Sequence, residues 1–283
     1  MQNQDFTIRT MTRKEMDIAV EWAAKEGWNP GRRDADLYYS ADPQGFLIGL
    51  LGEYPVATIS AIKYDESFGF LGFYIVKPEY RGQGYGMQIW DAGLSYLQGR
   101  NLGLDGVIAQ QENYKKSGFQ LAYRNRRYEG MGGSNTEEKA SIVRLASLPF
   151  HIVDSYDRPF FPATRSQFIK SWINQPESVA LGIMEDGRLS GYGVIRPCRS
   201  GWKIGPLYAD SPQLAELLFL SLKSQTKPSD PVFLDTPEVN PEATALAERH
   251  NMKVVFETAR MYTETSPDIP LQRLFGVTSF EVG

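Results

Sequence analysis

Residues 74–86 read Tyr-Ile-Val-Lys-Pro-Glu-Tyr-Arg-Gly-Gln-Gly-Tyr-Gly, and this stretch decides the fold. The apolar run at residues 68–76 predicts a strand that leads into it. Apolar residues at helical spacing over residues 89–97 predict a helix that follows it. Three glycines therefore stand where a strand gives way to a helix.

The turn carries the groups that an anion needs. Gly82, Gly84 and Gly86 allow backbone N–H groups to approach a ligand closely, and the N-terminus of the next helix attracts negative charge. Arg81 adds a forked, charged donor. The turn therefore predicts a pyrophosphate site, although by itself it is equally compatible with a plain tight turn.

Two other phosphate loops are excluded by spacing. The turn has no Gly-Lys-Ser/Thr, which excludes a Walker loop. Its glycines do not follow the GxGxxG spacing of a dinucleotide-binding turn. The pattern Arg-x-x-Gly-x-Gly after a strand that ends Val-x-Pro instead resembles the coenzyme A signature of the GNAT superfamily of acyl-CoA N-acyltransferases.

The resemblance covers roughly residues 6–130 and implies a coenzyme site in this part of the chain. In the family, main-chain groups of the strand before the turn orient the thioester. The implied coenzyme-binding residues are Tyr74, Ile75, Val76, Arg81, Gly82, Gln83, Gly84, Tyr85, Gly86 and Met87.

A second match lies downstream, where Tyr114 stands four residues before the pair Gly118-Phe119. In the family a tyrosine at this place protonates the departing thiolate, so the resemblance implies that Tyr114 is catalytic. A single tyrosine on a helix also suits core packing. The glycine turn, in the expected order and distance, favours the catalytic role.

The base that accepts the proton of the attacking amine is not evident. Many family members carry a glutamate on the strand before the turn, but residues 68–76 contain no acid. The candidates are Asp105, Glu112, and water held by Ser60 or Tyr64.

Composition limits the class of protein. The chain has 283 residues, of which 42% are hydrophobic, and a net charge of −4 without a long basic run, so we expect a globular protein that binds no nucleic acid. No apolar stretch suits a membrane span or a signal peptide. Cys198 is the single cysteine, and His151 and His250 are far apart, so we expect no disulfide and no metal. These features favour a cytoplasmic enzyme.

The predicted elements of the first half follow the order strand, helix, three antiparallel strands, helix, strand, helix, strand, which is the GNAT order. A capping box at Thr12 and Glu15 predicts the first helix, which Gly27 ends. The predicted strands span residues 7–11, 45–51, 56–64, 68–76, 104–108 and 122–128, and a short helix is expected at 36–40.

The second half repeats this order at an offset of about 133 residues. Gly72 aligns with Gly205, and Arg127 aligns with Arg260. Another capping box is expected at Thr164, three residues before Gln167. We therefore predict an α/β (α+β) protein of two GNAT-like domains, each a mixed, mostly antiparallel sheet flanked by helices. The predicted domains are residues 1–132 and 133–283, with the boundary in residues 130–138.

The second copy lacks the residues implied in coenzyme binding. Arg81, Gly84 and Gly86 align with Leu214, Leu217 and Phe219, and Tyr114 aligns with Ala247. Ser211-Pro212 instead predicts a capped helix at the place of the glycine turn. The second domain is therefore expected to be degenerate, with one coenzyme per chain. It either shapes the substrate pocket or stabilises the first domain.

The main hypothesis is an N-acetyltransferase that moves an acetyl group from acetyl-CoA to an amine. The alternative is a catalytically silent acyl-CoA-binding regulatory module, which the missing acid allows. The acceptor is a small-molecule amine or a protein amine. A hydroxyl acceptor, a longer acyl donor and the oligomeric state stay open.

Overall fold

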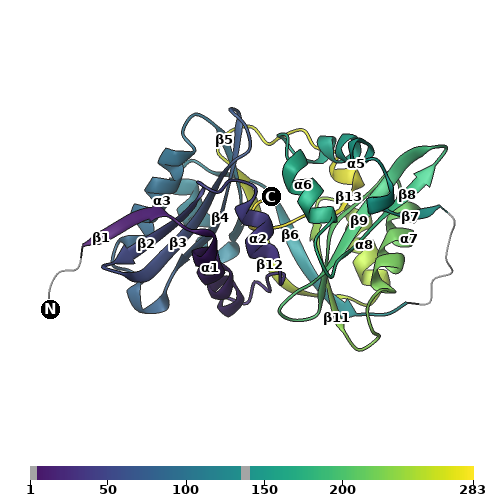
Figure 1. The fold of residues 1–283 in the computed structure, drawn as a ribbon, viewed down its shortest axis with the longest axis horizontal. Helices are drawn as coiled ribbons and strands as arrows, with labels where there is room; N and C mark the ends of the chain where they lie inside the picture. Colours follow the sequence, from purple (N-terminus) through teal and green to yellow (C-terminus); the bar gives the residue numbers. More distant parts are fainter. Residues whose placement is uncertain (1–4, 135–140) are drawn as a thin grey trace.

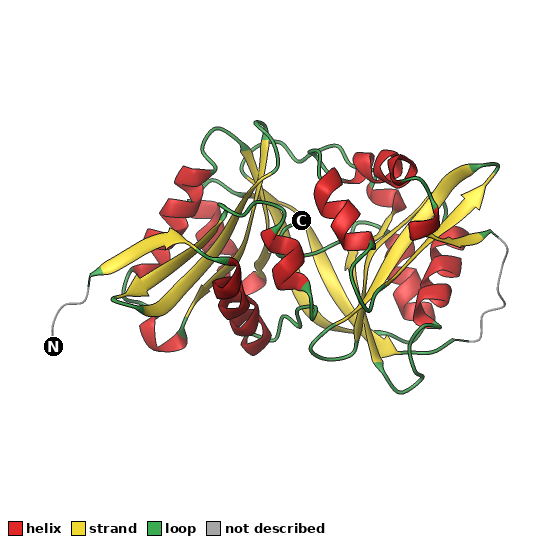
Figure 2. Ribbon diagram, viewed as in Figure 1, coloured by secondary structure: helices red, strands yellow, loops and turns green. Residues whose placement is uncertain are grey.

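The computed structural model describes residues 5–134 and 141–283. One sheet of 13 strands runs through both halves of the chain (Figures 1 and 2). Part of the expected boundary at residues 130–138 lies outside the described residues, so the division at 132/133 stays a prediction.

The first half has the expected order of elements. Its strands are β1 (Phe6–Thr10), β2 (Phe46–Leu51), β3 (Tyr54–Lys63), β4 (Phe68–Val76), β5 (Asn101–Val107) and β6 (Gln120–Met131). Its helices are α1 (Arg13–Lys25), α2 (Asp34–Tyr39), α3 (Tyr85–Tyr96) and α4 (Gln111–Lys116).

The second half repeats this order and adds one strand at its end. Its strands are β7 (Ile142–Arg144), β8 (Val179–Glu185), β9 (Arg188–Pro197), β10 (Trp202–Ala209), β11 (Pro231–Pro237), β12 (Lys253–Tyr262) and β13 (Leu274–Gly276). Its helices are α5 (Phe150–Asp157), α6 (Ser166–Ile173), α7 (Pro212–Lys223) and α8 (Pro241–Arg249).

The helix starts follow from local sequence with one exception. Thr12 and Glu15 form the expected capping box of α1, and Ser211 caps α7 ahead of Pro212. The capping box expected at Thr164 is wrong: α6 begins after Arg165 without a side-chain cap. The Thr164 hydroxyl is instead bonded to Arg158, and this contact replaces the local cap.

The helices cover the sheet unequally on its two faces. On one face α1, α2, α5 and α6 share a single apolar core that spans both halves. In that core the rings of Tyr38 (α2) and Trp172 (α6) stack with their centroids 6.0 Å apart. On the other face α3 and α7 cover separate cores. The shared core therefore holds the two halves together as one body.

β6 and β12, the equivalent strands of the two halves, are exchanged between them. The strand order is β1-β2-β3-β4-β5-β12-β6-β11-β10-β9-β8-β7, so β12 of the second half pairs with β5 of the first. In return β6 of the first half pairs with β11 of the second. β6 and β12 also pair with each other, antiparallel, at the centre of the sheet (Figure 1). Each half therefore completes the other's sheet.

Two buried ion pairs connect the exchanged strands to their neighbours in the opposite half. Arg127 of β6 binds Asp235 of β11 through Nε and Nη2, at 2.7 and 2.8 Å. Arg260 of β12 binds Asp105 of β5 in the same bidentate way. These are the arginines that the sequence offset aligns. All four side chains are at most 7% exposed. Water therefore cannot stabilise one charge of a pair if its partner is removed.

Arg127→Met is expected to lower the free energy of unfolding by about 3–5 kcal/mol, because it leaves the Asp235 carboxylate buried and unpaired. Urea denaturation measures the change. Arg126→Met is the matched control, since the neighbouring arginine pairs with Glu238 and Glu257 at the surface and its loss should cost less than about 1 kcal/mol. Equal losses of unfolding free energy in the two variants would show that the buried pair stabilises the fold no more than the surface pair does.

Candidate active site

A cleft opens where β4 and β5 separate. The two strands pair in parallel only over Phe68–Leu71 and Asn101–Leu104. Beyond that point the register of β4 against β3 shifts, and Phe73 takes a left-handed φ of 45°. The Thr58 hydroxyl donates to the Phe73 carbonyl oxygen at 2.8 Å and holds this bulge. Beyond the pairing, both strands line a cavity of about 510 Å³.

The glycine turn lines this cavity. Gly82 and Gly84 have φ of 76° and 84°, and Gly84 is the N-cap residue of α3. A Cβ at either residue would meet no atom within 4 Å, so the space beside the turn is open. The first turn of α3 leaves backbone N–H groups without helical partners. The arrangement suits an anionic group, as the sequence predicts.

Arg81 lies at the mouth of the cavity with half of its side chain exposed. Its Nε donates to the Val76 carbonyl oxygen at 2.8 Å, which ties the turn to the end of β4. Its Nη2 pairs with the Glu26 carboxylate after α1. The guanidinium is therefore held beside the turn.

Tyr114 lies deep in the same cavity. Its ring packs against Trp90 of α3, with centroids 5.5 Å apart, and lies over Gly106 of β5. A Cβ at Gly106 would be 2.2 Å from the ring, so the ring's position requires glycine there. Burial, and to a lesser degree the neighbouring Tyr74, raises the pKa of the Tyr114 phenol. The phenol therefore stays protonated at neutral pH and is able to donate.

Most residues expected at the site line the cavity. Those that do are Tyr74, Ile75, Val76, Arg81, Gly82, Gly84, Gly86, Met87 and Tyr114. The side chains of Gln83 and Tyr85 are engaged elsewhere: the Gln83 amide donates to the Glu79 carbonyl oxygen, and the Tyr85 ring packs on Phe6. The binding roles of all these residues stay predictions.

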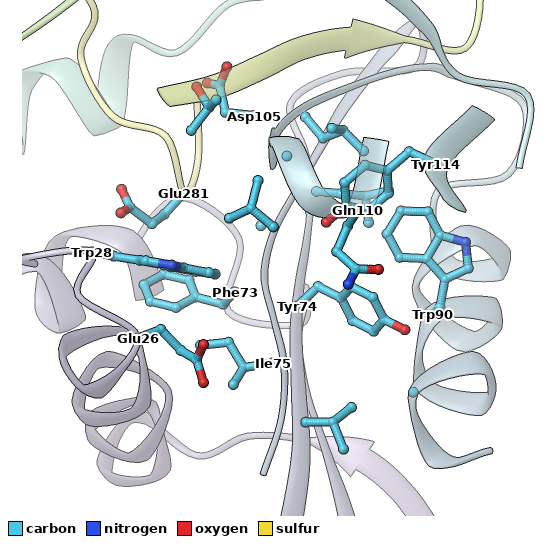
Figure 3. Close-up of a pocket in the computed structure, with 18 of the residues that line it drawn as sticks. Glu26, Trp28, Phe73, Tyr74, Ile75, Trp90, Asp105, Gln110, Tyr114 and Glu281 are labelled. Atoms are coloured by element: carbon cyan, nitrogen blue, oxygen red, sulfur yellow. The ribbon is translucent and has the colours of Figure 1, made fainter. Parts of the chain in front are cut away.

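The cavity has two sides, which Figure 3 shows as two groups of side chains. Tyr74, Trp90 and Tyr114 belong to the core under α3. On the opposite side lie Trp28 and Phe73, which belong to the core under α1 and α2. The cleft therefore passes through the sheet, with the glycine turn and Tyr114 on one side and an aromatic chamber on the other.

Sequence reasoning missed the residues of this second side. Trp28, Phe256, Phe280 and Glu281 all line the cavity. Phe256 comes with the exchanged strand β12, and Phe280 and Glu281 come from the segment after β13. No local pattern marks these residues, because their neighbours in the site are distant in the sequence. Gln110, beside Tyr114, was also missed.

The candidate bases have other roles. Both carboxylate oxygens of Asp105 accept from Arg260, and one also accepts from Asn125. Burial raises the pKa of Asp105, and the Arg260 charge opposes that rise. Glu112 pairs with Lys115 on the surface of α4, outside the cavity lining.

Ser60 and Tyr64 hold the segment after β13 in place. The Ser60 hydroxyl donates to the Glu281 carbonyl oxygen, and the Tyr64 hydroxyl donates to the Val282 carbonyl oxygen. These two side chains therefore position the segment that brings Glu281 to the cavity.

The equivalent cleft of the second half is filled. β10 and β11 also pair only briefly, over Trp202–Ile204 and Val232–Leu234. β13 occupies the space beyond, where it pairs antiparallel with Leu207 and Tyr208 of β10. A Cβ at Gly276 would be 2.8 Å from the Leu234 side chain, so the fit is close. The loss of the glycine turn thus coincides with the loss of the cleft.

Comparison with known families agrees with this geometry. The description "Acetyltransferase (GNAT) family" matches residues 12–119, and "Acetyltransferase (GNAT) domain" matches residues 153–276. The chain belongs to the GNAT superfamily. It is an acyltransferase of the tandem type, since one match covers each half.

Individual relatives extend over the whole chain. Holothin acyltransferase of Pseudoalteromonas sp. (strain SANK 73390) is 27% identical over 282 residues, which cover 100% of this chain and 96% of that protein. A proposed acetyltransferase from Pyrococcus horikoshii has a TM-score of 0.84 at 22% identity, over 100% of this chain and 97% of its own.

A tandem GNAT protein from the clavulanic acid biosynthesis pathway has a TM-score of 0.65 at 10% identity, over 93% of this chain and 100% of its own. At such identities the two solved structures show a shared fold.

Residues 5–134 and 141–283 contain no group of three His, Cys, Asp or Glu side chains placed to hold a metal ion. Within the same ranges, no helix has both the length and the apolar character needed to cross a membrane.

Gly106→Ala is expected to destabilise the protein by about 1–3 kcal/mol, because the new methyl overlaps the Tyr114 ring. In a Tyr114→Ala background the same change should cost far less. A double-mutant cycle by urea denaturation measures this coupling. Additive losses would contradict the contact between the ring and the glycine.

Proposed function

We propose that this protein transfers an acetyl group from acetyl-CoA to the amine of a small molecule, with the donor bound in the cleft of the first half. The observation that carries the proposal is the continuity of the cleft. The open glycine turn, the bulged strand β4 and the buried phenol of Tyr114 line one cavity. The glycine turn suits the pyrophosphate of the donor, β4 suits the thioester, and Tyr114 suits the leaving sulfur.

The residues present fit the donor. The open space beside Gly82 and Gly84, at the N-terminus of α3, suits a pyrophosphate that accepts backbone hydrogen bonds. Arg81 adds a positive charge when it exchanges Glu26 for a phosphate oxygen. Beyond Leu71 the edge of β4 beside the cleft no longer pairs with β5, so its main-chain groups are available to orient the thioester.

The burial of Tyr114 suits it to be the proton donor. The amine nitrogen forms a bond to the thioester carbonyl carbon as the carbon–sulfur bond breaks. The Tyr114 hydroxyl, kept protonated by its raised pKa, supplies a proton to the departing sulfur. The acetyl-CoA donor is thereby converted to free thiol.

A small acceptor suits the far side of the cavity. The whole cavity, which includes the donor side, has a volume of about 510 Å³, so its far side has room for a small acceptor. Segments from both halves enclose that side. The relative named holothin acyltransferase, which matches over the whole chain, supports acyl transfer as the reaction.

Gly84→Val should weaken coenzyme A binding about 10- to 100-fold, since the side chain blocks approach of a charged group to the backbone. Gly99→Val is the matched control: Gly99 has φ of 83° and equally open surroundings, but lies outside the cavity lining. Calorimetry should give one site per chain for the wild type, because β13 fills the second cleft. Two sites, or equal affinities of the two variants, would contradict the assignment.

Tyr114→Phe keeps the ring and removes the proton. With acetyl-CoA and a reactive amine, thiol release should slow about 10²- to 10⁴-fold while coenzyme A affinity is unchanged. An unchanged rate would assign Tyr114 to packing alone. A wild type that binds coenzyme A but releases no thiol with any amine would favour a silent binding module.

A further inference from the structure

The segment after β13 lies directly against β3 and β4. A Cβ at Gly72 would be 2.1 Å from the Glu281 carbonyl oxygen, so the close approach depends on glycine at that position of β4. Ser60 and Tyr64 of the first half hold the same segment by hydrogen bonds to its carbonyl oxygens. Phe280 and Glu281, from the end of the second half, therefore form a wall of the first half's cleft.

This wall carries a buried carboxylate. Glu281 is 3% exposed and lines the cavity, on the side of Trp28 and Phe73 (Figure 3). Its Oε2 accepts from the Ser279 hydroxyl at 2.8 Å and lies 3.2 Å from the Tyr38 hydroxyl, whose single proton it shares with the Asp34 carboxylate at 3.0 Å. Among the described residues no donor is assigned to Oε1. One carboxylate oxygen is thus held in place and the other is available.

Glu281 differs from the other buried acids in its charge balance. Four buried aspartates each have an arginine partner: Asp34 with Arg196, Asp105 with Arg260, Asp157 with Arg165, and Asp235 with Arg127. Within residues 5–134 and 141–283, no cationic side chain pairs with Glu281. A buried carboxylate without a cation is costly, unless a ligand supplies the positive charge.

We propose that Glu281 binds the acceptor as an ammonium ion and takes its proton. This assignment rests on the proposed function and names the substrate class: a small primary amine on an apolar body. Trp28, Phe256 and Phe280 supply the apolar wall for that body, and aromatic faces also favour a nearby cation. Glu281 thus fills the place of the acid that β4 lacks.

The proton balance of the step is complete. Glu281 takes one proton from the ammonium ion, and the neutral nitrogen then bonds to the thioester carbonyl carbon. As the carbon–sulfur bond breaks, Tyr114 protonates the sulfur, and the second nitrogen proton replaces the one that Tyr114 gave. Glu281 finally releases its proton to solvent. The products are the amide, the thiol and one proton.

Titratable and charged groups surround Glu281 on several elements. Tyr38 and Asp34 come from α2, Asp105 comes from β5, and Arg127 comes from β6. Glu26 lines the same cavity from the end of α1. Each of these acidic neighbours is balanced by an arginine: Asp34 by Arg196, Asp105 by Arg260 and Glu26 by Arg81. Arg127 is likewise balanced by Asp235, so among the described residues Glu281 carries the charge on this side of the cavity that has no ion-pair partner.

The test compares Glu281→Gln with the wild type, using acetyl-CoA and a panel of alkyl and arylalkyl primary amines, which are ammonium ions at neutral pH, between pH 6 and 10. At neutral pH, kcat/KM for the best amine should fall about 10²- to 10⁴-fold, with coenzyme A affinity unchanged. The deficit should narrow as pH rises, because more of the amine is then already neutral. A merely structural role would lower thermal stability without this pH dependence.

Glu66→Gln is the matched control, since Glu66 is a fully exposed glutamate outside the cavity lining and its loss should leave the rate unchanged. If Glu281→Gln fails to fold, Glu281→Asp keeps the charge but retracts it, and should retain the fold while losing rate. Equal pH profiles for Glu281→Gln and wild type would overturn the assignment of Glu281. A wild type inactive with every amine would overturn the proposed function and this assignment together.

Discussion

β6 and β12, the equivalent strands of the two halves, each pair with a strand of the opposite half, and the remaining features of the site depend on this exchange. β12 binds β5 along its edge, while β4 leaves β5 beyond the short parallel pairing. Without β12, the separated end of β5 would lack a partner on both edges. The matching Arg–Asp pairs penalise any other register of these strands, since a shift would leave buried charges unpaired.

One continuous segment makes the two halves differ. β13 fills the cleft of the second half, and the residues that follow it line the cleft of the first. The degenerate half therefore has a structural part in the site: it closes its own cleft with a strand and contributes side chains to the other. The sequence left open whether this half shapes the pocket or only stabilises its partner, and the cavity lining supports both roles.

Charge pairing distinguishes the acids that stabilise the fold from Glu281, the acid that we assign to the site. Asp105 and Asp235 have the same bidentate arginine contact in equivalent places, which indicates that both serve the strand exchange. Asp105 lines the cavity, but its oxygens are already used. Glu281 has polar partners on one oxygen and no paired cation among the described residues. Hydrogen bonding can orient a carboxylate without neutralising it, and such a group suits a cationic ligand.

The sequence by itself determined the order of elements, the glycine turn, the place of Tyr114 and the duplication. These features follow from short-range patterns: apolar periodicity, caps, and glycines at the turn, where Gly82 and Gly84 take positive φ. Only the tertiary structure decided which strands pair across the halves, that Asp105 is bound by Arg260, and that Glu281 reaches the cavity. Those contacts join residues far apart in the chain. Their selection depends on packing, burial and charge pairing, which no local window of sequence contains.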